Sequence, residues 1–78
     1  MKVLFYGRLA ETIGSELEVP GGCSVAELRE KLIFDHPAAE QTLRSSRSRA
    51  CVGDTLVPDD FAIGADTTVE FLPPVSGG

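Results

Sequence analysis

A single strong helix lies between two groups of strand-like segments, and this order narrows the possible folds more than any other property of the sequence. Ser24 and Glu27 have the spacing of a capping box, in which each side chain bonds the backbone amide of the other residue. Apolar residues follow at helical spacing at Val25, Leu28 and Leu32, with Glu27, Arg29, Glu30 and Lys31 at the polar positions between them. The helix is expected to end near residues 35–36, because Pro37 disfavours helical geometry in the residue before it.

Two strand-like segments precede this helix. Residues 2–8 begin with β-branched and aromatic side chains that are apolar on both faces, which predicts a central strand. Residues 15–19 alternate polar and apolar side chains, the pattern of a half-buried strand. Between these strands, residues 9–13 are expected to form a short helical turn that Gly14 closes.

After the main helix, the sequence predicts a second short helix and a return of strands. Pro37 suits a first helical turn, so a weak helix is expected over residues 37–43. Residues 49–57, with Gly53-Asp54 at the turn, predict a tight β-hairpin. Phe61 and Ile63 are expected to pack under the sheet.

Residues 67–72 form the last predicted strand, with Val69 and Phe71 on one face and Glu70 and Leu72 on the other. This strand and the first one are apolar enough to lie side by side in the middle of one sheet. The order predicts an α+β fold in a single domain over residues 1–72. Its mixed sheet of four to five strands covers one main helix plus a short second helix.

The sheet face away from the main helix is expected to expose Tyr6, Leu56 and Leu72. An exposed apolar patch of this kind usually marks a surface that binds a partner. A loop that covers the patch is the alternative, and the sequence leaves both open.

Residues 73–78 form a tail without core residues, Pro73-Pro74-Val75-Ser76-Gly77-Gly78. Each proline fixes φ near about −65°, so the tail is stiff at its root. The two glycines have no Cβ, so they suit a channel too narrow for any side chain. A frayed chain end is the alternative reading, but the two prolines favour a tail that reaches into another protein.

Composition and charge exclude several classes of function. The formal net charge of −5 argues against nucleic acid and favours a protein partner with a basic patch. The basic segment of Arg44, Arg47 and Arg49 has no interleaved aromatic residues, and a solvated loop is expected there. No apolar run approaches the ~20 residues needed to cross a bilayer. Because a signal-peptide core is also absent, a cytoplasmic protein without membrane contact is expected.

No catalytic or metal-binding constellation is visible. The sequence has no Ser/His/Asp set, no Cys/His pair and no zinc-ligand spacing, so neither a free-standing enzyme nor a bound metal or cofactor is expected. His36, before Pro37, is expected at the surface, and Cys51 is expected to be a small buried hydrophobe. Cys23 precedes a helix start, where the helix dipole favours a lower thiol pKa, and whether Cys23 is reactive is left open.

The whole chain, from the opening Lys2-Val3-Leu4-Phe5-Tyr6 to the ending Pro-Pro-Val-Ser-Gly-Gly, resembles the small subunits of molybdopterin synthase. These are ubiquitin-like sulfur carriers with a β-grasp fold. The six-residue ending is the most specific part of the resemblance, and the opening strand, the Ser24 helix and the strand at residues 55–57 fall at the expected places.

The resemblance implies a protein that is acted upon by others. An E1-like adenylating enzyme, using ATP and Mg, would adenylate Gly78, and sulfur from a donor protein would then give a C-terminal thiocarboxylate. With Gly77 clearing the channel, the tail would enter the large subunit of molybdopterin synthase and donate sulfur to cyclic pyranopterin monophosphate, in an assembly expected to be a heterotetramer. The positions implied in partner binding are Tyr6, Leu56, Leu72, Pro73, Pro74, Val75 and Ser76.

Three alternatives remain open on the sequence alone. A thiazole-type or other sulfur carrier also ends in Gly-Gly, although such carriers tend to lack the double proline. An interaction-only β-grasp module would bind its partner equally well without Gly77 and Gly78. A protein modifier that becomes attached to lysines is a variant of the carrier.

Overall fold

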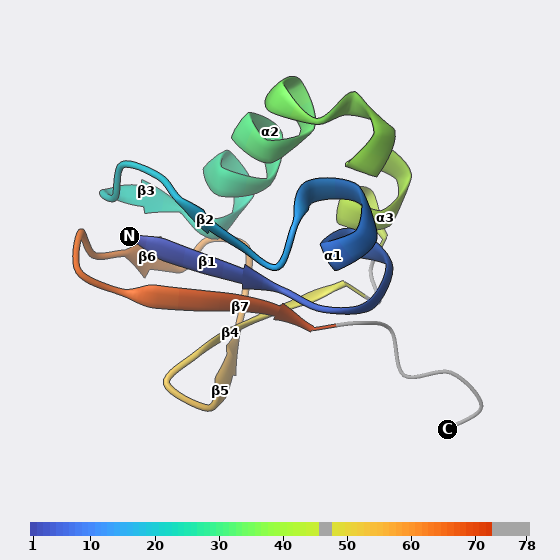
Figure 1. Cartoon of the computed structure of the whole chain (residues 1–78). Helices are drawn as coiled ribbons and strands as arrows, with labels where there is room; N and C mark the ends of the chain where they lie inside the picture. Colours follow the sequence, from blue (N-terminus) through green and yellow to red (C-terminus); the bar gives the residue numbers. More distant parts are fainter. Residues whose placement is uncertain (46–47, 73–78) are drawn as a thin grey trace.

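The computed structural model describes residues 1–45 and 48–72, which fold into a five-stranded sheet, a two-stranded ribbon and three α-helices (Figure 1). In chain order the elements are β1 (Lys2–Phe5), α1 (Gly7–Ile13), β2 (Glu16–Glu18), β3 (Cys23–Ser24), α2 (Val25–Asp35), the 3₁₀ turn η1 (Pro37–Ala39), α3 (Glu40–Arg44), β4 (Arg49–Val52), β5 (Thr55–Val57), β6 (Ala62–Ile63) and β7 (Thr68–Leu72). No helix in this described part is long and apolar enough to span a membrane.

The first and last strands lie side by side in the middle of the sheet, as the sequence predicts. The strand order is β2-β1-β7-β4-β5, and β1 pairs with β7 in parallel, while the other pairs in this sheet are antiparallel. Val3 pairs with Val69 and Phe5 with Phe71. The mixed sheet with one long helix is the expected α+β, β-grasp arrangement, which is therefore confirmed.

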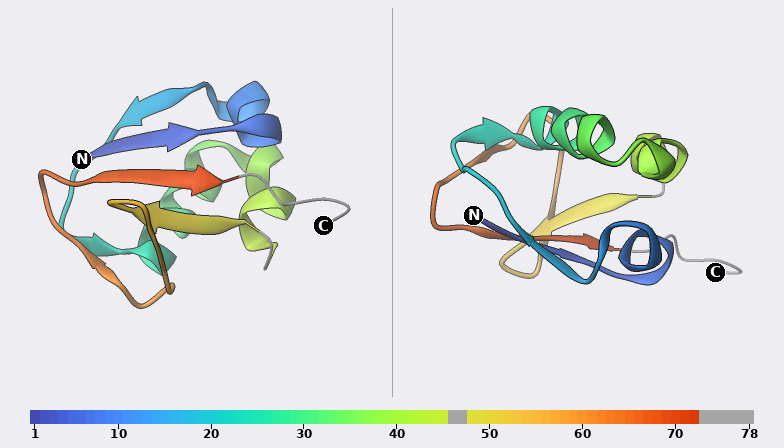
Figure 2. Two further views of the ribbon diagram at one scale, coloured as in Figure 1. Left: turned by 90° about the horizontal axis from the view of Figure 1, so that it is seen from below. Right: turned by 45° about the horizontal axis from the view of Figure 1, so that its top comes forward.

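The core lies between one face of the sheet and α2, which crosses that face (Figure 2). Alternate residues of β1 and β7 point into it, and the rings of Phe5 and Phe71 stack with their centroids 6.0 Å apart. Helix α2 contributes its apolar stripe, Val25, Leu28, Leu32 and Ile33. The side chains that alternate along the strands therefore pack against the side chains at helical spacing in α2, and together they form one core layer.

Helix α2 begins with the predicted capping box. The Ser24 Oγ accepts a hydrogen bond from the Glu27 backbone N–H at 3.1 Å, and the Glu27 Oε1 accepts one from the Ser24 N–H at 2.8 Å. The helix ends at Asp35, and His36 is half-buried at its C-cap before Pro37. The second helix is present but divided, since its first turn, η1, is 3₁₀ and only Glu40–Arg44 is α-helical.

The hairpin β4–β5 turns at Gly53 and Asp54, whose φ angles of 55° and 65° are both positive. A two-residue turn with both φ angles positive matches the twist of the strands that it joins. The tight hairpin expected from Gly53-Asp54 is therefore confirmed.

The ribbon β3–β6 was not expected from the sequence. Cys23 pairs with Ile63 and Ser24 with Ala62. Each strand has only two residues, too few to show any alternation. Ile63 is buried and Phe61 packs partly against the core, so their predicted place under the sheet is confirmed.

Candidate functional site

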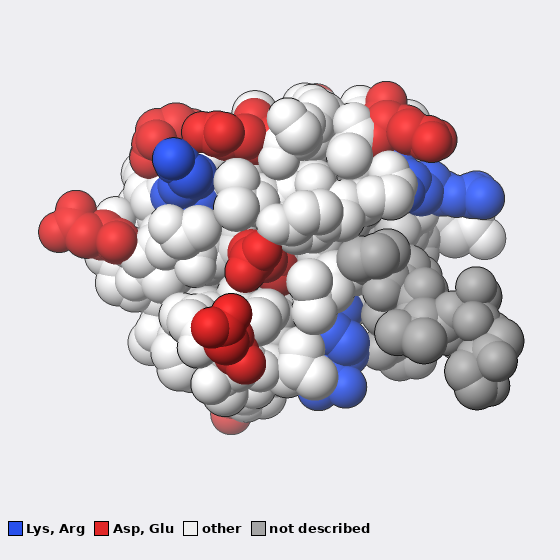
Figure 3. All heavy atoms as spheres, turned by 60° about the horizontal axis from the view of Figure 1, so that its bottom comes forward, with Lys and Arg blue, Asp and Glu red and all other residues white. Residues whose placement is uncertain are grey.

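The side of the five-stranded sheet away from α2 is the candidate site, and we call it the open face. Its side chains are those that alternate with the core residues along β1, β4, β5 and β7, followed by the residue after β1. They are Lys2, Leu4, Tyr6, Arg49, Cys51, Leu56, Thr68, Glu70 and Leu72. Figure 3 looks obliquely onto this side, where uncharged residues make up most of the surface and both acidic and basic side chains are set among them.

The three residues predicted for this face lie on it. Tyr6 is 39% exposed and Leu56 is 47% exposed, so the described residues do not cover them as a loop would. Leu72 is half-buried and alternates with Phe71, which points into the core. The structure thus brings Tyr6, Leu56 and Leu72 to one side of the sheet, while their role in binding a partner stays a prediction.

Glu70 forms a hydrogen bond on this face that the sequence did not indicate. The Tyr6 hydroxyl donates a hydrogen bond to the Glu70 Oε2 at 2.5 Å. This bond to a carboxylate raises the pKa of the Tyr6 hydroxyl above its ordinary value, and partial burial adds to the shift. The two residues are 64 positions apart, so only the parallel register of β1 and β7, which places Leu4 beside Glu70, could have indicated the contact.

The open face ends where the predicted tail begins. Strand β7 lies between β1 and β4, and Leu72 is its last residue. The predictions for the tail concern residues outside the described part of the chain, as does the boundary predicted after residue 72. These tail residues are Pro73, Pro74, Val75, Ser76, Gly77 and Gly78. They stay predictions. The last described residue, Leu72, ends a strand in the middle of the sheet, on the same face as the exposed Tyr6 and Leu56.

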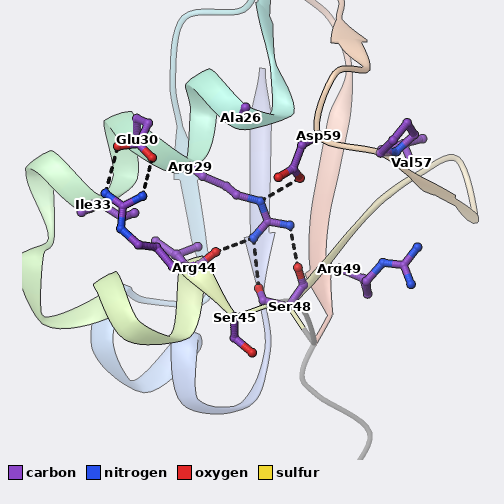
Figure 4. Close-up of a pocket in the computed structure, with 12 residues that line it drawn as sticks. Ala26, Arg29, Glu30, Ile33, Arg44, Ser45, Ser48, Arg49, Val57 and Asp59 are labelled. Atoms are coloured by element: carbon purple, nitrogen blue, oxygen red, sulfur yellow. Dashed lines mark hydrogen bonds and ion pairs between the residues drawn. The ribbon is translucent and has the colours of Figure 1, made fainter.

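Apart from the open face, a hollow of about 460 Å³ lies between α2, α3 and the start of β4 (Figure 4). Its central side chain is Arg29, which is 12% exposed although the helical pattern placed it on the polar face. The Arg29 guanidinium donates to the backbone oxygens of Leu43 at 2.7 Å and Ser48 at 2.5 Å, and to the Asp59 carboxylate at 3.1 Å. These bonds occupy the guanidinium, so Arg29 joins α2 to the chain on both sides of residues 46–47 and is a structural residue.

The solvated loop expected over Arg44, Arg47 and Arg49 is confirmed only in part. Arg44 and Arg49 are exposed, but Arg44 is the last residue of α3, Arg49 is the first residue of β4, and Ser48 before it is buried. Arg44 pairs with Glu30 at 2.7 Å and with Glu40 at 2.9 Å, and these bonds raise the pKa of Arg44 and lower the pKa of Glu30. Arg47 lies outside the described residues. Exposed ion pairs of this kind contribute little to stability.

Neither cysteine has the surroundings of a reactive thiol. Burial, followed by the nearby charge of Glu27, raises the pKa of Cys23, which corrects the expectation that the start of α2 would lower it. Cys51 is 7% exposed and lies between Glu70 and Leu56 in the sheet register, as expected for a small buried hydrophobe. The described residues contain no group of three or more potential metal ligands.

Comparisons with known proteins agree with the fold and extend across the whole chain. The model of the ThiS family matches residues 3–78. The molybdopterin synthase sulfur carrier subunit of Escherichia coli (strain K12) is 31% identical over 80 residues, an alignment that covers 100% of this chain and 99% of the relative.

Among solved structures, the crystal structure of SAMP1 from Haloferax volcanii superposes with a TM-score of 0.78 at 24% identity, covering 99% of this chain and 97% of that one. A second crystal structure, of small archaeal modifier protein 1 from the same organism, gives a TM-score of 0.78 at 22% identity and covers 95% of both chains. At these identities the superpositions support the fold.

Proposed function

Because this chain belongs to the ThiS family, we propose that it is a sulfur carrier whose C-terminal glycine, Gly78, is activated and converted to a thiocarboxylate. The acceptor that we propose is cyclic pyranopterin monophosphate, bound by the large subunit of molybdopterin synthase. The carrier has no catalytic site of its own in this proposal.

The match that runs through residue 78 carries the proposal. The match to the ThiS family model extends over the Pro-Pro-Val-Ser-Gly-Gly segment of this chain, and the full-length relative is named as a sulfur carrier subunit of molybdopterin synthase. That relative favours molybdopterin synthase over a thiazole synthase as the recipient of the sulfur.

The chemistry assigns the reacting carbon to Gly78 and every catalytic group to partner enzymes. A terminal carboxylate, with a pKa of about 3.5, is ionised in the cell and is a poor electrophile. An adenylating enzyme would join it to the AMP part of ATP, with release of pyrophosphate. A persulfide on the donor protein would then attack the carbonyl carbon through its outer sulfur and expel AMP, which gives an acyl disulfide. A thiol of a partner enzyme would cleave the S–S bond of this acyl disulfide, which releases the thiocarboxylate and leaves a disulfide between the two cysteines of the partner proteins.

In this proposal, the folded domain positions the C-terminal tail in the active sites of the partner enzymes. Strand β7 is held between two neighbours, so Leu72 gives the tail a fixed point of departure. Tyr6 and Leu56 offer exposed apolar surface beside that point, where the large subunit and the adenylating enzyme would dock in turn. An extended segment of six residues spans at most about 20 Å, which suffices to reach a buried site from a docked body.

Intact-mass spectrometry tests the proposal. The full chain is incubated with the E1-like enzyme, ATP, Mg²⁺ and a sulfur source, and a mass increase equal to one oxygen-to-sulfur exchange is expected. The matched control is a chain that lacks Gly77 and Gly78, because it keeps both cysteines and so reveals any sulfur bound to them. If the full chain gains no such mass, or if the shortened chain gains it as well, the proposal is wrong.

A binding experiment tests the identity of the recipient. The large subunit of molybdopterin synthase from the same organism should co-purify with the chain, and a thiazole synthase should not. If the thiazole synthase co-purifies and the large subunit does not, the chain is a sulfur carrier for thiazole formation instead.

A further inference from the structure

The open face is not uniformly apolar, because a carboxylate lies in the middle of it. In the sheet register Glu70 has Leu4 beside it on β1 and Cys51 beside it on β4, and Leu56 follows Cys51 on β5. Glu70 is already half-buried in the free chain. A protein that docks on this face removes water from the carboxylate, and burying a charge without a compensating partner is costly.

Tyr6 satisfies only part of the bonding capacity of this carboxylate. Its hydroxyl donates one hydrogen bond, to Oε2. An ionised carboxylate has about four acceptor positions, so most of them remain available to a docking protein. The same bond orients the Glu70 side chain toward Tyr6, which follows β1 directly.

The described residues give Glu70 no cation of its own. No lysine or arginine in residues 1–45 and 48–72 forms an ion pair with it. Lys2, the basic residue of β1, pairs with Glu16 at 3.5 Å. Arg49 stands opposite Leu72 in the register and is therefore a diagonal neighbour of Glu70 on the open face, but the two form no ion pair in the free chain.

We propose that Glu70, positioned by Tyr6, makes the open face selective for a partner that places an arginine or lysine in the middle of an otherwise apolar contact surface. This inference rests on the proposed function, in which that partner is the large subunit of molybdopterin synthase. A basic group that reaches the free acceptor positions of Glu70 forms a desolvated, charge-assisted hydrogen bond, while a purely apolar competitor leaves the charge buried and unpaired.

A second copy of this chain is a poor occupant of the same face. In a two-fold symmetric contact centred on Glu70 the same patch faces itself, so the two Glu70 carboxylates would approach each other. Each copy also carries a formal net charge of −5, which adds repulsion at longer range. The charge pattern therefore favours a basic partner over self-association.

The experiment compares the affinity of four full-length chains for the purified large subunit: wild type, E70Q, Y6F and E16Q. Glutamine keeps the shape of glutamate and removes its charge. E16Q is the matched control, because Glu16 lies in the same cross-strand row, opposite Leu4, but at the sheet edge and already paired with Lys2. Circular dichroism and thermal melting confirm that each variant is folded.

Loss of the Glu70 charge is expected to weaken binding to the large subunit far more than loss of the Glu16 charge. E70Q should weaken binding by at least about tenfold, mainly through faster dissociation, because the partner's cation is left buried without its counter-charge. Y6F should weaken binding less, since it removes only the hydrogen bond that orients the carboxylate. E16Q should change the affinity by less than about threefold. The Kd of E70Q should also depend less on salt than that of the wild type.

Three results would overturn the inference. If E70Q binds as tightly as the wild type or more tightly, Glu70 does not recognise a cation. If E70Q and E16Q weaken binding equally, the overall charge of the chain explains the effect. If the wild type does not bind the large subunit at all, or forms a dimer through this face, the proposed partner is wrong and the inference falls with it; the mass-shift experiment then still reports separately on the sulfur chemistry.

Discussion

The guanidinium of Arg29 lies over the ring of Phe71, with its Cζ 5.1 Å from the ring centroid. Phe71 belongs to the central strand of the sheet and Arg29 to α2, so the contact crosses the core from layer to layer. A cation over an aromatic face is attracted by the ring, and burial strengthens the attraction. The same guanidinium donates hydrogen bonds to the backbone oxygens of Leu43 in α3 and Ser48 after it, so Arg29 connects the sheet, α2, α3 and the chain that follows α3.

Replacement of Arg29 by Met is therefore expected to lower the free energy of unfolding by about 2–4 kcal/mol, because the two buried carbonyls lose their donor. Met keeps much of the side-chain packing, so the loss reports on the hydrogen bonds. Urea unfolding followed by circular dichroism measures it. Arg44→Met is the matched control on the surface, with an expected loss of less than about 1 kcal/mol. Equal losses for the two variants would show that the buried bonds of Arg29 contribute nothing beyond an exposed ion pair.

The capping box of α2 gives a second stability prediction. Ser24→Ala removes the acceptor for the Glu27 N–H and should cost about 1 kcal/mol. Ser24→Thr keeps a hydroxyl at the same position and should cost much less, so it serves as the control. Thermal melting of both variants checks the difference, and a melt of Ser24→Ala that coincides with that of the wild type would contradict it.

The elements that the sequence predicted correctly are those with a local signal. Ser24 and Glu27 are three residues apart, so the start of α2 could be derived without knowledge of the rest of the fold. The alternation of Val69 and Phe71 with Glu70 and Leu72 correctly indicated the two faces of β7. In these cases one period or one motif contains all the information that is needed.

The features that the sequence did not reveal depend on contacts between distant segments. Arg29 stands at a polar position of the helical pattern, and its burial follows from acceptors 14, 19 and 30 residues further along the chain. The bond between Tyr6 and Glu70 requires the register of two parallel strands. The expected effect of the helix dipole on Cys23 was outweighed because the side chain is partly buried beside Glu27. The charge and spacing of residues along the sequence do not show which of their side chains become buried in the fold.

Exposed side chains of the open face should contribute to binding but little to the stability of the fold, and Leu56 offers a direct test. Its side chain is 47% exposed, so Leu56→Ala should change the free energy of unfolding by less than about 0.5 kcal/mol. Under the proposed function, the same change should weaken binding to the large subunit by about tenfold, because it removes apolar surface from the contact. Calorimetric titration and thermal melting measure the two effects. Val57→Ala is the control, since Val57 is buried in the core and its loss should lower stability while leaving the open face intact. A Leu56→Ala chain that binds normally would exclude this face as the docking surface.

The ionisation of Tyr6 reports directly on its bond with Glu70. Tyr6 is the one tyrosine in the sequence, so the absorbance of tyrosinate during an alkaline titration follows this residue alone. The hydrogen bond to Glu70 raises the pKa of Tyr6, so the folded chain should titrate above the ordinary value for tyrosine.

Glu70→Gln should shift this titration back toward the ordinary value, because the negative charge next to the hydroxyl is removed, whereas Glu16→Gln should leave it unchanged. Since the folded-state pKa is the higher one, the contribution of this bond to stability is fully present below the unfolded-state pKa of tyrosine. It is lost as the pH rises through the folded-state value, so the titration of this group does not make stability vary with pH near neutrality. Coincident titration curves for the wild type and Glu70→Gln would show that the carboxylate does not hold the hydroxyl in solution. Tyr6 could then no longer act as the residue that positions Glu70 for a basic partner.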